Sequence, residues 1–594
     1  LWEHLRNGRD LVGPVPPSRW DADAFHDPDP ARAADGRIYC RTGGFLDDVD
    51  AFDAAFFGIP EADADAMDPQ ERLFLQSAWA AIEDAGYTRD GLRERHPRGR
   101  GVDAGVFVGV TTNTYSQLTP EEWRRGRAVN AGAMPWSIAN RVSYVFDFQG
   151  PSLPIDTACS SSLVAIQMAC ESLRRGECAI ALAGGVNLYL HPAKYHSLCA
   201  RRMLAEHGRC RSFGAGDDGF VPGEGVGTLV LKPLAQAQDD GDHIHGVIAG
   251  GAHAHSGRAN GYSAPNPVSQ AAVIAAALAD AGVDADAIGY VEGDGTGTQL
   301  GDGLELVSLA NAFSGRSADA GPCAIGSVKA NVGHGESAAG IAGIARVLLQ
   351  LRHRMLVPTL HSDPANPDID FESSPFRLQR ALAPWAAPRD GAPRRAIVNS
   401  FGAGGVNACM VLEEAPAQTP VPSPHGPQLF LLSARDSERL RERVDALRAC
   451  LRDWHRDPVA APAPAAVAFT LQAGREAMEE RLAVVADGFD ALLRELDAWC
   501  DGQPSQRLVP GRVEPHQRRK ANRAEVVEAL CADWRAGRLD ALALQWVQGQ
   551  DLPWARLHED AGIAPARVPL PPYPLARTRH WITDAPPPGP PAAL

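Results

Sequence analysis

The chain has 594 residues, of which 45% are apolar and 22% are charged, and its formal net charge is −16 at pH 7. A chain of this length predicts about three or four domains. The acidic balance disfavours nucleic acid as a partner, and no stretch approaches the ~18 consecutive apolar residues of a membrane span. The 11 cysteines show neither CxxC nor Cys/His spacing, and no signal peptide is recognisable. We therefore expect no metal site and a reducing, cytoplasmic location.

The first 150 residues are expected to alternate helices with a buried strand. Pro69 suits the first turn of a helix whose apolar face includes Trp79 and Ile82. Residues 105–110 have the composition of a buried strand, and residues 135–146 are expected to form a second helix.

A cysteine lies where a short β-like entry runs into a helix. Apolar residues recur at helical spacing after it, and a glycine stops the pattern: Leu163, Ile166, Cys170, Leu173 and Gly176. Cys159 is therefore placed at the first turn of this helix. Free N–H groups and the helix dipole favour an anion there, which predicts a lowered thiol pKa and a reactive thiolate. The alternative is an inert, buried structural cysteine.

In a later part of the chain, predicted strands are followed directly by polar loops. A strand at 288–292 precedes the glycine-rich loop 293–302, and a strand at 324–328 precedes the loop 329–336 and a helix to about residue 351. Residues 399–407 form a glycine-rich turn between two strands. Strand–loop–helix units recurring along residues 100–415 predict a layered α/β fold, within a first domain expected to span 1–415.

Beyond residue 415 the composition changes. Residues 416–426 are rich in Pro, Thr and Ser and are expected to be a linker. Strands at 429–432 and 482–486, each followed by a helix, predict a small α/β subdomain over 427–565. Residues 584–594 form a Pro-rich tail.

The cysteine motif resembles that of a known family. The run Asp156-Thr157-Ala158-Cys159-Ser160-Ser161-Ser162 is similar to the nucleophile motif of ketosynthase domains of modular polyketide synthases. The resemblance implies a thiolase-like, five-layer αβαβα fold and a homodimer. It also implies that Cys159 takes an acyl chain, as a thioester, from the phosphopantetheine arm of an acyl carrier protein. Carrier proteins upstream and downstream are the implied partners, and no bound cofactor is expected.

Two further resemblances concern the rest of the synthase. The run Phe220-Val221-Pro222-Gly223-Glu224-Gly225 is similar to ketosynthases whose acyltransferase is a separate protein. Residues 427–565 resemble the subdomain that flanks a ketosynthase. Residues 566–583 resemble the linker that follows an acyltransferase and are expected to pack back on the ketosynthase as a strap. With no room for an acyltransferase between them, the resemblance implies part of a larger multidomain synthase that is loaded in trans.

The family's chemistry uses one cysteine and two histidines. His334 matches the second histidine, and Lys329 and Glu336 match its neighbours. Asp294 stands where the first histidine belongs, so this departure puts condensation in doubt. The resemblance also assigns an oxyanion hole and a group of substrate-channel or gating residues. The hole would be formed by the N–H groups of Cys159 and Ala403, and the second group comprises Phe401, Gly402, Thr296 and Thr298.

An ionised aspartate accepts hydrogen bonds and cannot donate them. It would repel an enolate and a malonyl carboxylate by on the order of 4 kcal/mol at about 4 Å and an effective dielectric near 20. We also expect Asp294 to lie within reach of His334 and to raise the histidine pKa. The leading hypothesis is a non-elongating ketosynthase that passes on an acyl chain without extending it.

Two alternatives stay open. One is a condensing enzyme, or another carbon–carbon bond-forming enzyme, with Asp294 acting as a base. The other is a docking and dimerisation scaffold without chemistry, against which the intact motif around Cys159 argues. Cys409 also departs from the family pattern, and the sequence gives no reason for it.

Overall fold

The computed structural model describes residues 1–583 apart from residues 217, 299, 389–390, 418–425, 459–460, 521–522, 561 and 563–564. Most of the expected linker at 416–426 and the whole tail at 584–594 therefore lie outside the described residues.

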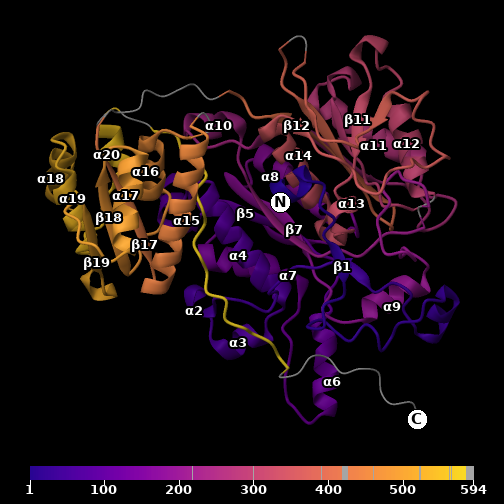
Figure 1. Ribbon diagram of the computed structural model, residues 1–594, viewed down its shortest axis with the longest axis horizontal. Helices are drawn as coiled ribbons and strands as arrows, with labels where there is room; N and C mark the ends of the chain where they lie inside the picture. Colours follow the sequence, from indigo (N-terminus) through magenta and orange to yellow (C-terminus); the bar gives the residue numbers. More distant parts are fainter. Residues whose placement is uncertain are drawn as a thin grey trace.

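Two sheets form the centre of the larger body (Figure 1). The first has the strand order β6-β5-β7-β8, with bounds β5 Ala104–Gly109, β6 Ser152–Ile155, β7 Ile180–Asn187 and β8 Gly225–Leu231. The second has the order β13-β11-β10-β15-β16-β9, with bounds β9 Gly246–His255, β10 Tyr290–Glu292, β11 Cys323–Gly326, β13 Phe376–Leu378, β15 Arg395–Phe401 and β16 Val406–Glu414. Strands β5 and β7 are parallel and buried along their whole length, as expected for strands covered on both faces.

Helices complete five layers. Helices α8 (Ser161–Arg174) and α14 (Ala339–His353) lie between the sheets and contact both. Helices α4 (Pro69–Asp84) and α7 (Pro135–Phe146) cover the first sheet from outside, and α11 (Pro267–Ala281) covers the second beside α12 (Gly301–Ala312). The expected αβαβα order is confirmed. None of the described helices combines the length and hydropathy needed to cross a bilayer.

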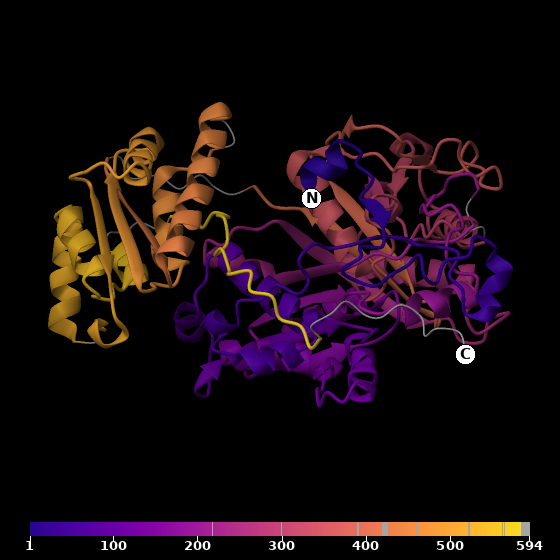
Figure 2. The same cartoon turned by 60° about the horizontal axis from the view of Figure 1, so that its bottom comes forward.

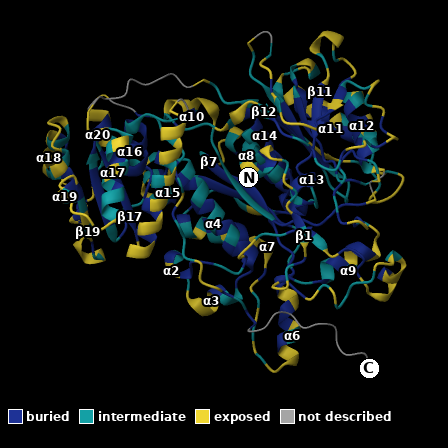
Figure 3. Ribbon diagram, viewed as in Figure 1, coloured by how far each residue is buried: buried dark blue, intermediate teal, exposed yellow. Residues whose placement is uncertain are grey.

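Shorter elements surround these layers. They include α1 Trp2–Arg6, β1 Val12–Pro14, β2 Thr42–Gly44, α2 Ala54–Phe57, α3 Glu61–Ala66, α5 Arg89–Arg95, α6 Leu118–Arg124, α9 Ala193–Ala200, α10 Leu234–Asp239 and α13 Lys329–Val332. Figure 3 shows that burial concentrates in the two sheets and the helices between them, whereas one side of α6 and the outer loops are exposed.

A second, smaller α/β unit lies beside α4 and α10 (Figures 1 and 2). Its antiparallel sheet has the order β17-β18-β19, with bounds β17 Gln428–Ala434, β18 Glu480–Ala486 and β19 Leu508–Arg512. Its helices are α15 Ser437–Arg456, α16 Pro464–Ala473, α17 Phe489–Cys500, α18 Ala524–Arg535, α19 Leu539–Val547 and α20 Trp554–Asp560. Phe430 and Leu432 pack with α15 and α17 in a core that continues into the larger body, and Leu429 and Leu431 pack with α18 to α20.

Residues 565–583 run as extended chain from this unit across the larger body, and both ribbon views show this path in yellow. The Ala576 N–H donates to Asp53 Oδ2 at 2.8 Å, and Arg72 Nη1 donates to the His580 carbonyl at 2.7 Å. These contacts tie the two units together along the chain's last described segment.

Candidate functional site

Cys159 lies in the tight turn between β6 and α8. Ala158, just before it, has the left-handed φ of +58°, a strained conformation for a residue with a Cβ. Ser160 Oγ donates to the Thr157 carbonyl at 2.9 Å, which holds the turn closed. Helix α8 begins at Ser161 with Ser160 as its N-cap. Cys159 thus stands two residues before the helix and not in its first turn, which corrects the sequence prediction.

The thiol of Cys159 is less acidic than expected. The residue is half-buried, and desolvation, followed by the negative charges of Asp294 and Glu336, raises its pKa to about 12. The backbone N–H of Ala403 donates to the sulfur and lowers the pKa, as does the charge of Lys329, but both effects are smaller. The prediction of a lowered pKa is therefore wrong, because the sequence showed the helix start and not the surrounding burial and carboxylates.

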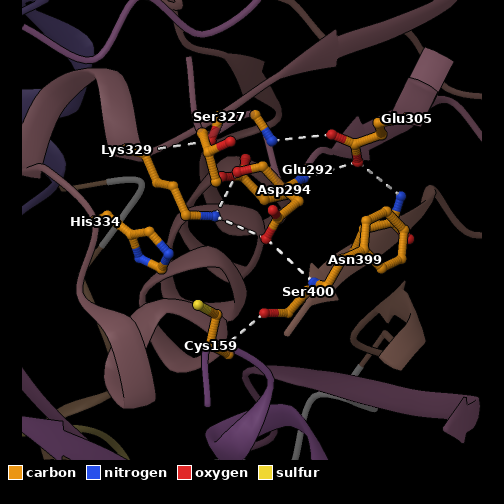
Figure 4. Close-up of polar contacts among 12 residues, drawn as sticks. Cys159, Glu292, Asp294, Glu305, Ser327, Lys329, His334, Asn399 and Ser400 are labelled. Atoms are coloured by element: carbon orange, nitrogen blue, oxygen red, sulfur yellow. Dashed lines mark hydrogen bonds and ion pairs between the residues drawn. The ribbon is translucent and has the colours of Figure 1, made fainter. Parts of the chain in front are cut away.

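Asp294 follows β10 and is committed to two donors. Its Oδ1 accepts from Lys329 Nζ at 3.1 Å and from the Phe401 N–H at 3.3 Å, and Lys329 also donates to the Asp294 carbonyl (Figure 4). Burial opposes a charged lysine, yet the charge of Asp294 and its hydrogen bond give Lys329 a raised pKa. The lysine also offsets the repulsion that the sequence argument assigned to this aspartate.

His334 has a different environment from the one predicted. Its Nδ1 accepts the Glu336 N–H at 3.0 Å, and the structure assigns it no hydrogen bond or ion pair with Asp294 within the described chain. Burial, followed by the positive charges of Lys329 and Lys194, holds its pKa well below the usual range. The expectation that Asp294 raises the histidine pKa is therefore wrong, because the aspartate pairs with the lysine.

Glu336 is the centre of a second network. Its φ is +42°, and its carboxylate accepts from the Tyr189 hydroxyl at 2.6 Å and pairs with Lys194 Nζ at 2.8 Å. Lys194 and Tyr189 were not among the predicted site residues. They belong to the segment after β7, about 140 residues before Glu336 in the chain, so sequence spacing gave no signal for them.

Glu305, on α12, is another residue that the sequence argument missed. Its buried carboxylate accepts the N–H groups of Asp294 and Gly295 at 2.8 and 2.9 Å and the Asn399 amide at 3.1 Å. Burial, followed by the charge of Asp294, raises its pKa to about 7. Glu305 thereby fixes the loop that presents Asp294.

The turn from Phe401 to Ala403 faces the cysteine. A Cβ at Gly402 would lie 2.6 Å from the Thr157 carbonyl, so only glycine fits there without displacement. Ser400 Oγ donates to the Cys159 carbonyl at 2.9 Å (Figure 4). The turn and the cysteine loop are therefore locked together, with the Ala403 N–H on the sulfur.

The two threonines of the predicted channel group lie on the Asp294 loop. Thr296 Oγ1 and Thr298 Oγ1 are 3.0 Å apart. The backbone of Thr298 forms an isolated antiparallel β-bridge with that of Asp218. Both threonines are half-buried. These contacts lie within the loop and at residue 218, whereas Asp294, Lys329 and His334 lie close to Cys159 (Figure 4).

Four protein-family models match successive or overlapping parts of this chain. "Beta-ketoacyl synthase, N-terminal domain" covers residues 1–237 and "Beta-ketoacyl synthase, C-terminal domain" covers 245–363. "Ketoacyl-synthetase C-terminal extension" covers 365–462, and "RhiE-like, KS-MAT linker domain" covers 431–503. The chain belongs to the β-ketoacyl synthase family, as a ketosynthase domain of the polyketide synthase type.

Solved ketosynthase structures are similar to this chain in fold and sequence over almost its whole length. An oxazolomycin ketosynthase domain from Streptomyces albus is 43% identical with a TM-score of 0.87, covering 98% of this chain and 95% of that one. The ketosynthase from module 6 of the bacillaene synthase of Bacillus subtilis is 36% identical with a TM-score of 0.86, covering 98% and 96%.

Curated relatives are much longer. Polyketide synthase ThaG of Burkholderia thailandensis is 49% identical over 98% of this chain, and polyketide synthase PksL of Bacillus subtilis is 45% identical over 98%. The ketosynthase spans only 10% and 13% of their lengths.

Proposed function

We propose that this ketosynthase is non-elongating: it accepts an acyl chain from an upstream acyl carrier protein onto Cys159 and passes it downstream without condensation. The observation that carries the proposal is the state of Asp294. Its carboxylate can only accept hydrogen bonds, and it is committed to Lys329 and the Phe401 N–H.

Acyl loading needs only groups that are present. The Cys159 Sγ–acyl bond forms, the phosphopantetheine S–acyl bond breaks, and the thiol proton passes to the departing sulfur. The N–H of Ala403 points at Cys159, and with the Cys159 N–H it would stabilise the oxyanion of the tetrahedral intermediate. Transfer to the downstream carrier is the same exchange in reverse.

Condensation needs more. Malonyl loses CO₂ and leaves an enolate whose oxygen requires hydrogen-bond donors. The family resemblance places a histidine donor where this chain has Asp294. Losing one such donor costs on the order of 3 kcal/mol, which corresponds to roughly a hundredfold or more in rate. His334 alone remains as a side-chain donor of the family pair.

The wider assembly follows from the same reasoning. We place residues 1–415 as the ketosynthase domain, 427–565 as the flanking subdomain and 566–583 as the strap, within a cytoplasmic, multidomain synthase whose acyltransferase acts in trans. The match to a KS-MAT linker domain supports the flanking assignment, and the 11 free cysteines suit a reducing compartment.

A homodimer is part of this proposal. Among the described strands, edge strand β6 pairs only with β5, and an unpaired edge offers backbone groups to a second copy. Large apolar side chains are exposed on β6 and at the start of α7, which contacts it: Met134, Trp136 and Leu153. Exposed apolar surface of this kind is typical of a subunit interface.

The test is to incubate the protein separately with an acyl carrier thioester and a malonyl carrier thioester. We expect a covalent acyl adduct by intact mass in the first case and no CO₂ release in the second. Vigorous CO₂ release by the wild-type protein would overturn the non-elongating assignment, and the absence of any adduct would favour the scaffold.

A further inference from the structure

Glu336 holds its backbone in a conformation that glutamate seldom adopts. Its φ of +42° lies in the left-handed region, which non-glycine residues occupy only when their surroundings impose it. The carboxylate of Glu336 is held at both of its oxygens. The Tyr189 hydroxyl donates to Oε1 at 2.6 Å, and Lys194 Nζ lies 2.8 Å from Oε2.

Burial and further hydrogen bonds keep these two partners of Glu336 in place. Tyr189 is fully buried and Glu336 is 6% exposed. Lys194 Nζ also donates to Thr112 Oγ1 at 3.3 Å, so its ammonium is fixed from two sides. Each carboxylate oxygen of Glu336 therefore has its own donor.

The strained backbone has a direct consequence for His334. The Glu336 N–H donates to His334 Nδ1 at 3.0 Å. An N–H can donate only to a lone pair, so Nδ1 carries no proton and the proton of the neutral ring is on Nε2. The backbone of His334 is fixed as well, since its N–H donates to the Val221 carbonyl at 2.7 Å and its carbonyl accepts the Gly223 N–H at 2.8 Å.

We propose that Lys194 and Tyr189 are positioning residues for acyl transfer: acting through Glu336, they hold His334 as the neutral Nε2–H tautomer, a hydrogen-bond donor beside Cys159. In that state His334 cannot take the thiol proton at Nε2. It serves instead as a donor to the sulfur or to the acyl oxygen during exchange. This inference rests on the proposed acyl transfer, but the tautomer itself exists without substrate.

Two positive charges reinforce the same state. Lys194 and Lys329 both disfavour the imidazolium. Replacing Lys194 by methionine would remove one of these charges and one of the two carboxylate partners. The Glu336 backbone could then relax and move its N–H away from Nδ1.

The experiment measures the tautomer and the loading rate separately. Protein labelled with ¹⁵N-histidine gives long-range ¹H–¹⁵N correlations that distinguish Nε2–H, Nδ1–H and cationic rings. His334 is identified among the 18 histidines by the signal missing from His334→Gln. Loading from an acyl carrier thioester is followed by mass in the same preparations.

We expect the wild-type protein and Lys194→Arg to show the Nε2–H pattern. Tyr189→Phe and Lys194→Met should show a mixed or altered pattern. Their kcat for loading should fall about tenfold with an unchanged KM, less than the ~10²–10³ lost with a direct oxyanion donor. Lys232→Met is the matched control, because Lys232 is another largely buried lysine paired with carboxylates, those of Asp240 and Asp242, outside this network.

An Nδ1–H pattern in the wild type would overturn the proposal. So would an unchanged Nε2–H pattern in both Tyr189→Phe and Lys194→Met. If the wild type gave the expected spectrum but no acyl adduct, acyl transfer would fail as the function while the fixed tautomer stood.

Discussion

Lys329 and Asp294 form a buried ion pair close to the candidate nucleophile, with Nζ 3.1 Å from Oδ1 and both side chains at most 10% exposed (Figure 4). The pair turns an unpaired negative charge into a neutral unit. Toward an incoming enolate, Asp294 therefore differs from a histidine mainly because it provides no hydrogen-bond donor. Its negative charge matters less there, because Lys329 neutralises it.

Asp294→His should restore part of the lost chemistry. We expect malonyl decarboxylation to rise about ten- to a hundredfold, short of the full worth of a positioned donor because Lys329 loses its partner. Acyl loading should persist and become somewhat faster, because the charge of Asp294 is one of the effects that raise the Cys159 pKa. Asp294→Leu serves as the control, because leucine is of similar size and has neither a charge nor a hydrogen-bond donor. An equal gain in both variants would mean that charge, not the missing donor, blocks decarboxylation.

Cys159→Ala should abolish acyl loading, because it removes the proposed nucleophile, the thiol to which the Ala403 N–H donates. Intact mass after incubation with an acyl carrier thioester measures this. Cys170→Ala is the control, because Cys170 is also half-buried but lies within helix α8. An adduct that persists in Cys159→Ala would refute the assignment of the nucleophile.

Loading should become faster as pH rises. Burial disfavours the thiolate, so the pKa of Cys159 lies near 12 and the thiol is protonated at neutral pH. The thiolate fraction then grows about tenfold per pH unit below that value. Single-turnover loading, or alkylation of Cys159 by iodoacetamide, should rise with this slope across neutrality. A plateau at neutral pH would show that the pKa is lowered instead.

The sequence predicted the layers well and the electrostatics poorly. Helix 135–146 was predicted with the bounds of α7, because its apolar spacing and its proline are local signals. The direction in which the Cys159 pKa shifts, and the identity of the partner of Asp294, depend on burial and on loops that come together from distant positions in the chain. Asp294 and Lys329 are 35 residues apart, and Lys194 and Glu336 are further apart still. Local pattern carries no information on such pairs.

The dimer surface can be tested by charge. Trp136 is 57% exposed at the start of α7, and Trp136→Glu would place a carboxylate in the proposed interface. Obligate interfaces bury roughly 2,000 Å² or more, and a central unpaired charge is costly there. Sedimentation should give a dimer for the wild type and a 63.2 kDa monomer for the variant. Leu234→Glu on α10, away from this face, should remain dimeric.

The Lys329–Asp294 pair should show strong thermodynamic coupling. Lys329→Met leaves the Asp294 carboxylate buried without its cation, and breaking a buried pair in this way costs about 3–5 kcal/mol. Adding Asp294→Asn removes the stranded charge, so the double variant should be more stable than Lys329→Met alone. The measurement is a double-mutant cycle of apparent unfolding free energies in urea. The matched control is the exposed pair Arg174–Asp280, with an N···O distance of 3.0 Å, whose coupling should stay below about 1 kcal/mol. Equal coupling in the two cycles would mean that the site lysine and aspartate are solvated, and the account of Asp294 as a neutralised, donor-less group would fail.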